Sequence, residues 1–219
     1  MGMFYGHNQV KREPLSGLGY GLLYNWYAAS DTNFATSGWH VPTETEYITL
    51  KTFLGGDDVA GGKMKDSGYT NWNSPNTGAT NSSGFTAYGS SFRRVDGSFS
   101  ILKRYFHAWL SGTNKYSITL SYDSAWAFLS ITGNPLEGNS VRLIKDSTSL
   151  LDGETSTMTD YDGNVYDTIC IGTQEWIVQN WKCTHLNDGT TIPEVTNNTT
   201  WAGLTTMALC AHSNDWNNV

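Results

Sequence analysis

Two Cys-x-His pairs carry the residue types and the spacing that could hold a metal ion. Cys183 and His185 form the first pair, and Cys210 and His212 form the second. If each pair lies on a β-strand, its two side chains point to the same face, because residues i and i+2 of a strand share a face. Two such pairs could then supply the four ligands of a Cys₂His₂ zinc site. We favour the alternative that the cysteines are reduced, small buried apolar residues and that the histidines cap or hydrogen-bond nearby groups.

Acidic stretches could bind calcium, but their patterns favour other structures. The stretch 160–164, DYDGN, begins like a calcium-binding loop, yet the place of the twelfth, acidic residue of such a loop falls on Ile171. Asp-Gly is the usual turn dipeptide of a hairpin, so we predict a β-hairpin there. The stretch GGDD at 55–58 predicts a solvated loop after a helix. We therefore predict no cofactor, and calcium and zinc stay open as alternatives without support from the sequence.

The chain lacks the short motifs of common enzymes and the charge pattern of several binding classes. It contains no G-x-S-x-G, Walker or H-E-x-x-H motif. Its net charge is −7 and it has no basic run, which argues against nucleic acid or an anionic membrane surface as a partner. No stretch is apolar enough to span a bilayer, and no signal peptide is expected at the N-terminus. With 9 Trp, 12 Tyr and 8 Phe, however, the chain can form a sizeable core.

Few elements show a clear helical pattern. Apolar residues in 20–29 predict a short helix, and the capping box of Thr43 and Glu46 predicts a helix over 43–54 that ends at two glycines. The stretch 57–100 is rich in Gly, Asn, Ser and Thr with single aromatic residues, which is typical of long loops pinned to a core.

Strand patterns dominate the rest of the chain. Alternating β-branched and aromatic residues predict short strands within 101–145, and further strands flank the hairpin and a turn at Gly172. We predict an arm or tail at 1–17 and a polar linker at 147–157. The fold class is therefore α+β, with two helices at most, a small antiparallel sheet and long loops.

Long motifs of this chain resemble the Fibrobacter succinogenes major paralogous domain family. The stretch 158–190, MTDYDGNVYDTICIGTQEWIVQNWKCTHLNDGT, is similar to the opening half of that domain. Its second half is similar to YGLLYNWYAAS, SGWHVPTETEYITLKTFLGG, AGGKMKDSG, WNSPNTGATNSSGFTAYGSS and SVRLIKD. The stretch GWHVPTETEY also resembles a motif of formylglycine-generating-enzyme-like proteins. The resemblance implies a C-type-lectin-like fold with two helices, a small twisted antiparallel sheet and a long loop region.

The two halves stand in the opposite order to the family. The first half lies at 158–219 and the second at 18–146, so that 147–157 joins the family's two termini. The chain could be circularly permuted and close on itself, which the frequent proximity of domain termini favours. Alternatively, 158–219 could complete a neighbouring copy by strand exchange and build a homo-oligomer. We favour the first hypothesis, in which both halves form one domain.

Resemblance and composition together predict a ligand-binding face at 104–134. Formylglycine-generating enzymes need a cysteine pair in the second half of the fold, and residues 18–169 contain no cysteine, so we predict a protein that is not an enzyme. The segment 104–134 is rich in Tyr, Trp, Ser and Asn, which is typical of recognition surfaces. The resemblance implies that this region is exposed. The predicted ligand-binding residues are Tyr105, His107, Trp109, Ser111, Asn114, Tyr116, Tyr122, Trp126 and Phe128.

The resulting hypothesis is a lectin-like binding or display protein. It would recognise a glycan or a host-surface protein, on a bacteriophage virion or at an extracellular surface, and residues 1–17 would dock it to other virion proteins. The alternative is a self-assembling decoration or fibre protein whose exchanged halves link subunits. No insertion into a membrane is expected in either case.

Overall fold

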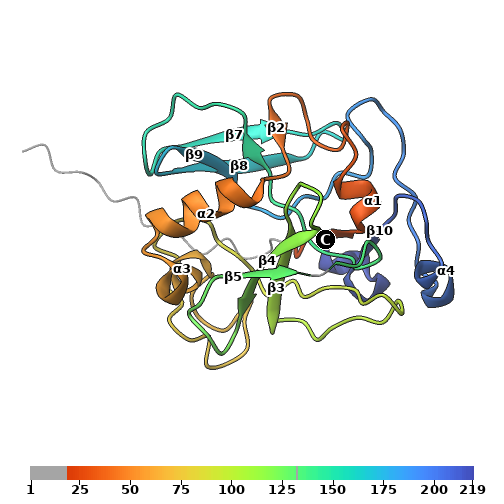
Figure 1. Cartoon of the computed structure of the whole chain (residues 1–219), viewed down its shortest axis with the longest axis horizontal. Helices are drawn as coiled ribbons and strands as arrows, with labels where there is room; N and C mark the ends of the chain where they lie inside the picture. Colours follow the sequence, from red (N-terminus) through yellow and green to blue (C-terminus); the bar gives the residue numbers. More distant parts are fainter. Residues whose placement is uncertain (1–18, 132) are drawn as a thin grey trace, which may run out of the picture.

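A computed structural model describes residues 19–131 and 133–219, and the predicted arm at 1–17 lies outside them (Figure 1). The described part contains four α-helices and ten strands, followed by two short 3₁₀ turns. In chain order the helices and strands are β1 (Leu22–Tyr24), α1 (Trp26–Ala29), β2 (Trp39–His40), α2 (Glu44–Phe53), α3 (Asp57–Met64), β3 (Tyr105–Trp109), β4 (Tyr116–Ser121), β5 (Phe128–Ile131), β6 (Ile144–Lys145), β7 (Thr155–Thr159), β8 (Val165–Ile171), β9 (Gln174–Ile177), α4 (Asn198–Ala202) and β10 (Leu209–Ala211).

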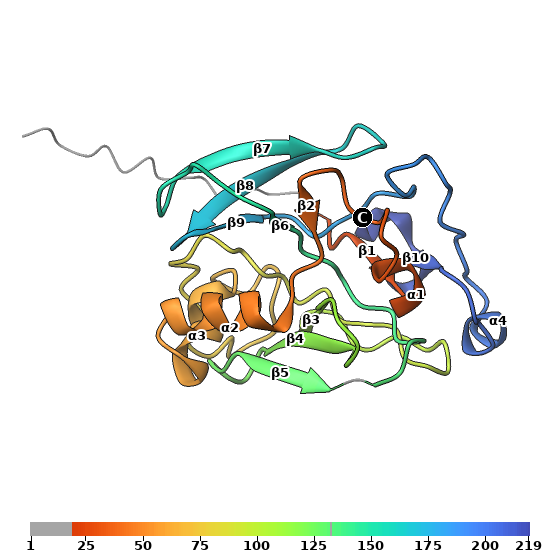
Figure 2. The same ribbon diagram turned by 45° about the horizontal axis from the view of Figure 1, so that its top comes forward.

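Three antiparallel sheets build the molecule. The largest has the strand order β2-β6-β9-β8-β7, a second has the order β3-β4-β5, and β1 pairs with β10. The five-stranded and three-stranded sheets lie on opposite sides of α2 and α3 (Figure 2). Side chains from both sheets and both helices share one hydrophobic cluster, which includes Leu50, Phe106, Ile118 and Trp176. The predicted mixture of a few helices with antiparallel strands is confirmed, although the strands form three sheets.

Helix α2 forms where its local signals predict it. The Thr43 side chain accepts a hydrogen bond from the backbone N–H of Glu46, and the Glu46 carboxylate accepts one from the backbone N–H of Thr43. These bonds satisfy donors that a helix N-terminus leaves without partners. Tyr47 and Leu50 are buried, as the helical spacing predicts, whereas Phe53 is 54% exposed.

The ring of His40 lies between two carboxylates and ties α2 to the five-stranded sheet. Its Nδ1 is 2.6 Å from Asp146 and its Nε2 is 2.9 Å from Glu46. Burial alone lowers the pKa of His40, but the hydrogen bonds to Asp146 and Glu46 outweigh burial and raise that pKa above its ordinary value. The charged imidazolium is therefore stabilised in the folded protein.

We expect this bridge to make stability depend on pH. Because the pKa of His40 is raised in the folded state, its contribution to the free energy of unfolding is complete below the unfolded pKa of about 6.5. This contribution is lost as the pH rises through the folded pKa. His40→Gln should therefore cost about 0.5 kcal/mol more at pH 5.5 than at pH 9, a small figure because the ring is about one-third exposed. Urea unfolding of both proteins at the two pH values measures this difference. An equal cost at both values would contradict it.

The predicted helix over 20–29 is wrong in its first half. Leu22–Tyr24 forms strand β1, because its backbone pairs with β10 and both faces of the strand are buried. The helix begins only after Asn25, whose side chain accepts a hydrogen bond from the backbone N–H of Ala28. Tertiary pairing therefore overrides the local apolar pattern.

Helix α3 occupies a stretch whose glycines predict a loop. Glycine lowers helix propensity by about 1 kcal/mol per residue. Here Gly61 and Gly62 permit close packing, since a Cβ on Gly61 would lie 2.2 Å from the Trp126 carbonyl oxygen and one on Gly62 would lie 2.3 Å from the Gly78 carbonyl oxygen. The GGDD stretch is accordingly the start of α3. The prediction of two helices at most is wrong, because the described residues form four.

Early and late parts of the chain pair with each other in the structure. Strands β7, β8 and β9 join β2 and β6 in the five-stranded sheet, and the β1–β10 pair joins the early and late parts of the chain. The backbone N–H of Tyr20 donates to the Asn218 carbonyl at 2.6 Å, and Gly19 lies against Val219. The predicted linker at 147–157 is too long, because Thr155 already begins β7 and pairs with β8.

Three buried cations bind the long loops, and the sequence did not predict them. Lys65, Arg93 and Arg142 are each fully buried. Each donates hydrogen bonds to three backbone carbonyl oxygens. Such bonds satisfy carbonyl groups that irregular backbone would otherwise bury without a donor.

The ammonium of Lys65 joins the loop after α3 to the end of β4. Its Nζ lies 3.0 Å from the carbonyl of Thr77, 2.8 Å from that of Ser121 and 2.7 Å from that of Ser124. Burial lowers the pKa of Lys65 to about 8. The side chain therefore keeps its proton at neutral pH and can donate all three bonds.

Candidate functional site

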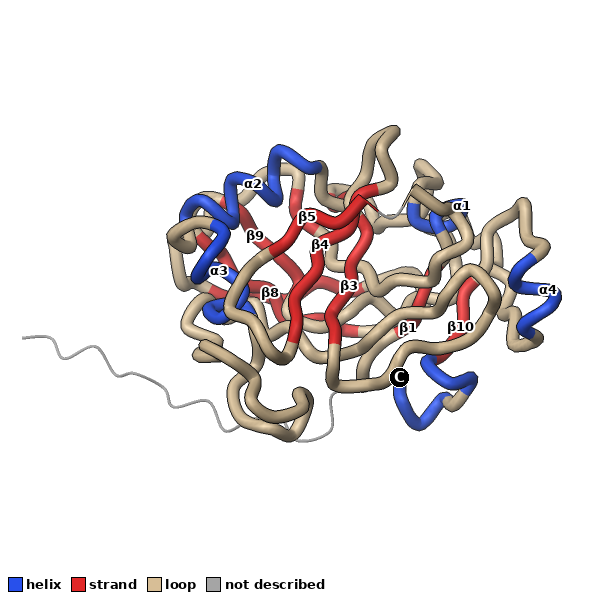
Figure 3. The backbone as a smooth tube through the Cα atoms, turned by 60° about the horizontal axis from the view of Figure 1, so that its bottom comes forward, coloured by secondary structure: helices blue, strands red, loops and turns tan. Residues whose placement is uncertain are grey.

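The outer face of the three-stranded sheet holds four of the predicted ligand-binding residues. Phe106 and Ala108 of β3 point into the core, so that the alternating residues Tyr105 and His107 point away from it. Thr119 of β4 pairs with His107 on one side and with Phe128 of β5 on the other, which places these residues in one row across the sheet. The three strands face the viewer in Figure 3.

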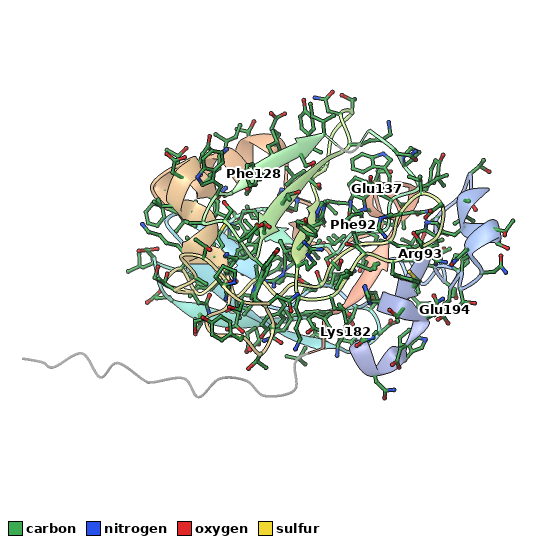
Figure 4. All side chains as sticks on the ribbon, turned by 90° about the horizontal axis from the view of Figure 1, so that it is seen from below. Phe92, Arg93, Phe128, Glu137, Lys182 and Glu194 are labelled. Atoms are coloured by element: carbon green, nitrogen blue, oxygen red, sulfur yellow. The ribbon has the colours of Figure 1, made fainter. Side chains whose placement is uncertain are left out.

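Ring contacts extend this row at both ends. The Trp126 ring centroid lies 5.4 Å from that of Phe128, and the Phe92 ring centroid lies 4.5 Å from that of His107. Tyr105 flanks His107 with a centroid distance of 6.0 Å. We call this row the aromatic belt. It consists of Phe92, Tyr105, His107, Trp126 and Phe128, and Figure 4 views the molecule from this side and labels Phe92 and Phe128.

The belt is open to solvent at one end and half-buried in its middle. Trp126 is 50% exposed and Phe128 is 38% exposed, whereas His107 and Tyr105 are partly covered. Burial lowers the pKa of His107 to about 4, so the imidazole is neutral at pH 7. Its Nδ1 lies 3.5 Å from the Thr119 hydroxyl. The belt thus offers aromatic surface interrupted by a hydroxyl and an uncharged imidazole.

Phe92 belongs to the belt although it lies outside the predicted segment 104–134. It lies in the loop before β3, and the guanidinium of Arg94 lies 5.6 Å from its ring centroid. The sequence signal was a single aromatic residue in a turn-rich stretch. Such a residue indicates a contact with the core but not the face on which it lies.

Trp109 is a core residue, so its prediction as a ligand contact is wrong. It is fully buried, and its Nε1–H donates to the Tyr24 carbonyl at 2.8 Å. Its ring packs edge-on against Trp26 of α1 at a centroid distance of 5.2 Å. Alternation places Trp109 on the outer face with His107, but α1 covers that end of the strand.

The other four predicted residues lie outside the ring contacts that define the belt. Ser111 and the exposed Asn114 lie in the turn between β3 and β4, and Tyr116 packs partly against the core. The guanidinium of Arg104 lies 5.2 Å from the Tyr122 ring centroid, and its Nη2 donates to the Tyr122 hydroxyl. Tyr122 thus adjoins the belt, because the same guanidinium lies 5.8 Å from the Tyr105 ring centroid.

The structure does not bring the two Cys-x-His pairs together. Cys183 packs in one hydrophobic cluster and Cys210 in another. His185 pairs with Asp162 at 2.5 Å, and the Nε2 of His212 lies 2.9 Å from the Ser100 carbonyl oxygen. Within residues 19–131 and 133–219, no three His, Cys, Asp or Glu side chains are grouped to hold a metal ion.

The cysteines have the properties of buried apolar residues. All three are free and buried. Burial raises the pKa of Cys183 to about 12 and that of Cys210 to about 11, although Arg93 lowers the latter in part. Protonated thiols are poor metal ligands and poor nucleophiles.

The predicted hairpin at 160–164 is confirmed. It joins β7 to β8, and Asp160 accepts hydrogen bonds from the backbone and side-chain N–H groups of Asn164 and from the Tyr166 hydroxyl. Both carboxylate oxygens of Asp160 thus have partners within the turn.

Among the described helices, none has the length and apolar composition needed to cross a membrane.

Comparison with known proteins gives one match. The sequence model of the Fibrobacter succinogenes major domain matches residues 6–145, which is more than half of the chain and includes every residue of the aromatic belt. No curated protein and no solved structure matches the chain. The chain therefore belongs to the Fibrobacter succinogenes major domain family.

Proposed function

We propose that the protein is a non-enzymatic, lectin-like binding module that recognises an extended glycan through the aromatic belt. The belt itself carries this proposal. Sugar rings present C–H faces that pack on aromatic side chains, while their hydroxyls need polar partners such as Thr119 and the neutral imidazole of His107. A row of such groups across an open sheet suits a chain of sugars better than a single compact ligand.

Charge and patterning favour a neutral glycan over a protein ligand. Protein interfaces centre on continuous apolar surface that becomes fully desolvated. In the belt, the exposed rings of Trp126 and Phe128 are instead separated from Phe92 by the polar Thr119 and by His107. The net charge of −7 disfavours strongly anionic glycans. The setting that we propose is a virion or an extracellular surface, because glycans on a cell surface are accessible to viruses and to other cells that attach to it.

We also propose that the domain has a C-type-lectin-like architecture with the family's halves in permuted order. The contact between Gly19 and Val219 and the sheet shared by early and late strands support a chain that closes on itself. No specific observation favours the alternative of a self-assembling fibre protein, since β10 pairs with β1 of its own chain.

We expect the double variant Trp126→Ala/Phe128→Ala to lose about fivefold to a hundredfold in glycan affinity. Aromatic contacts of this kind contribute about 0.5–1.5 kcal/mol each, and 1.4 kcal/mol corresponds to a factor of ten. An array of neutral oligosaccharides selects the probe, and calorimetry with the strongest binder measures the affinity of each protein.

Tyr69→Ala is the matched control, because Tyr69 is 63% exposed and lies outside the belt. It should bind as the unchanged protein does. If no oligosaccharide binds, or if the double variant retains full affinity, the belt is not a glycan site. Binding to a protein array instead, with loss in the same double variant, would support the protein-ligand alternative.

A further inference from the structure

A cleft lies between α1 and the turn that follows β3, on a part of the molecule that the aromatic belt does not use. Its volume is about 310 Å³, at the lower end of the range for small-molecule sites. Its lining includes Trp26, Asp31, Phe34, Trp39, His40 and Ser111. None of them belongs to the belt, so a ligand in the cleft and a ligand on the belt would make separate contacts.

One wall of the cleft is aromatic and fixed by packing. Trp26 packs against Trp109 at a centroid distance of 5.2 Å, and Phe34 packs edge-on against Tyr24 at 4.9 Å. Trp39 at the start of β2 is partly exposed. Because these rings are held by the core, the wall exists before any ligand arrives, which reduces the entropic cost of binding.

The rim of the cleft carries polar groups that are free to bind. Ser30, Asp31 and Thr32 are exposed and consecutive, and Ser111 faces the cleft from the turn after β3. Asp31 Oδ1 accepts a hydrogen bond from the backbone N–H of Asn33 at 2.8 Å. Within the described residues, the second oxygen of Asp31 and the hydroxyls of Ser30, Thr32 and Ser111 have no protein partner.

The charge of the cleft selects against anions. His40 is the basic residue of its lining, but its two ring nitrogens already contact Asp146 and Glu46. Lys145 approaches the Trp39 ring, yet its ammonium pairs with Glu175 at 3.0 Å. Asp31 therefore sets the local charge with a carboxylate that can accept from hydroxyl or ammonium donors.

We propose that this cleft binds one pyranose ring that carries hydroxyl or amino groups and no negative charge. The ring's C–H face packs on Trp39, and its donors meet Asp31 and the hydroxyls of the rim. The volume admits one ring, or two at most, which suits the end of a glycan or a free sugar. This inference does not depend on the aromatic belt, because the two sites share no residue.

Saturation-transfer NMR with glucose, glucosamine and N-acetylneuraminic acid tests the cleft directly. Glucose and glucosamine should show transfer and should change the tryptophan fluorescence with millimolar Kd values, whereas the anionic sugar should do neither. Asp31→Asn should weaken glucosamine about fivefold to tenfold and glucose less, because the asparagine side chain keeps the hydrogen bond to Asn33 but loses the charge. Ser111→Ala should weaken both sugars.

Asp58→Asn is the matched control, since it removes an exposed carboxylate of α3 outside the cleft. It should leave both affinities unchanged. The proposal is overturned if neither glucose nor glucosamine binds, if N-acetylneuraminic acid binds equally well, or if Asp58→Asn acts like Asp31→Asn. The proposal is also overturned if Trp126→Ala/Phe128→Ala loses monosaccharide binding while Asp31→Asn keeps it in full. That result would place the sugar on the aromatic belt.

Discussion

Replacing Arg142 with methionine is expected to lower the free energy of unfolding by about 3–5 kcal/mol. The Arg142 guanidinium donates to the carbonyls of Phe85, Thr86 and Ile177 at 2.8, 2.9 and 3.1 Å, and its Nε donates to Asn180 at 2.6 Å. Methionine fills much of the space but donates no hydrogen bond. Each buried carbonyl left without a donor costs about 1–3 kcal/mol.

Urea unfolding measures this loss, and the melting temperature should fall by roughly 10 °C for a protein of this size. Arg104→Met is the control, because Arg104 lies near the surface and stacks on Tyr122. Arg142→Lys should recover part of the loss, since an ammonium keeps the charge but cannot reach all four acceptors at once. A loss in Arg142→Met no larger than that of Arg104→Met would show that the guanidinium does not hold these loops.

Arg93→Met is expected to lower the free energy of unfolding by a similar amount, about 3–5 kcal/mol, and to loosen one region more than the rest. The Arg93 guanidinium donates to the carbonyls of Gly97, Val195 and Thr196 and to the Asn198 side chain. It therefore connects the loop before β3 to the segment that leads into α4.

Packing adds to these bonds. The guanidinium carbon of Arg93 lies 4.2 Å from the Trp201 ring centroid and 4.9 Å from that of Phe99. Desolvated contacts of this kind contribute about 2 kcal/mol in favourable cases. Methionine keeps part of the contact with Trp201 but none of its electrostatic component.

Hydrogen exchange distinguishes this local effect from a general one. In Arg93→Met, the amides of 195–204 should exchange much faster, while those of β8 and β9 should follow only the global change in stability. Arg94→Met is the control, because the neighbouring Arg94 is exposed and its side chain donates to one backbone carbonyl, that of Phe99. Uniform acceleration over the whole chain would contradict a role specific to the segment 195–204.

Elements with complete local signals could be predicted from the sequence. Helix α2 has its capping box and its apolar face within a dozen residues, and the hairpin of β7 and β8 has its Asp-Gly turn. Helix α3 could not be predicted, because its two glycines are required by contacts that are distant in sequence. Gly61 and Gly62 leave space for the backbone of Trp126 and Gly78, which lie close to them only in the folded protein. The same holds for β1, whose partner β10 lies at the other end of the chain.

Some residues of the candidate site could likewise be predicted from the sequence, and others could not. The predicted residues Tyr105 and His107 lie on the outer face of β3, but the composition of the segment 104–134 could not show that α1 covers Trp109 on that same face. Phe92 comes from a loop whose path no periodicity describes. The three buried cations gave no signal either, because an isolated Lys or Arg in a polar stretch is typical of the surface.

The acceptors of those cations have a consequence for sequence change. Lys65, Arg93 and Arg142 hold the loops mainly through backbone carbonyl oxygens, and every residue type supplies the same carbonyl. Positions such as Thr77 and Thr196, whose side chains are exposed, can therefore exchange their side chains while the anchor stays intact. The loops are free to diverge in composition, whereas the three cations that anchor them are not.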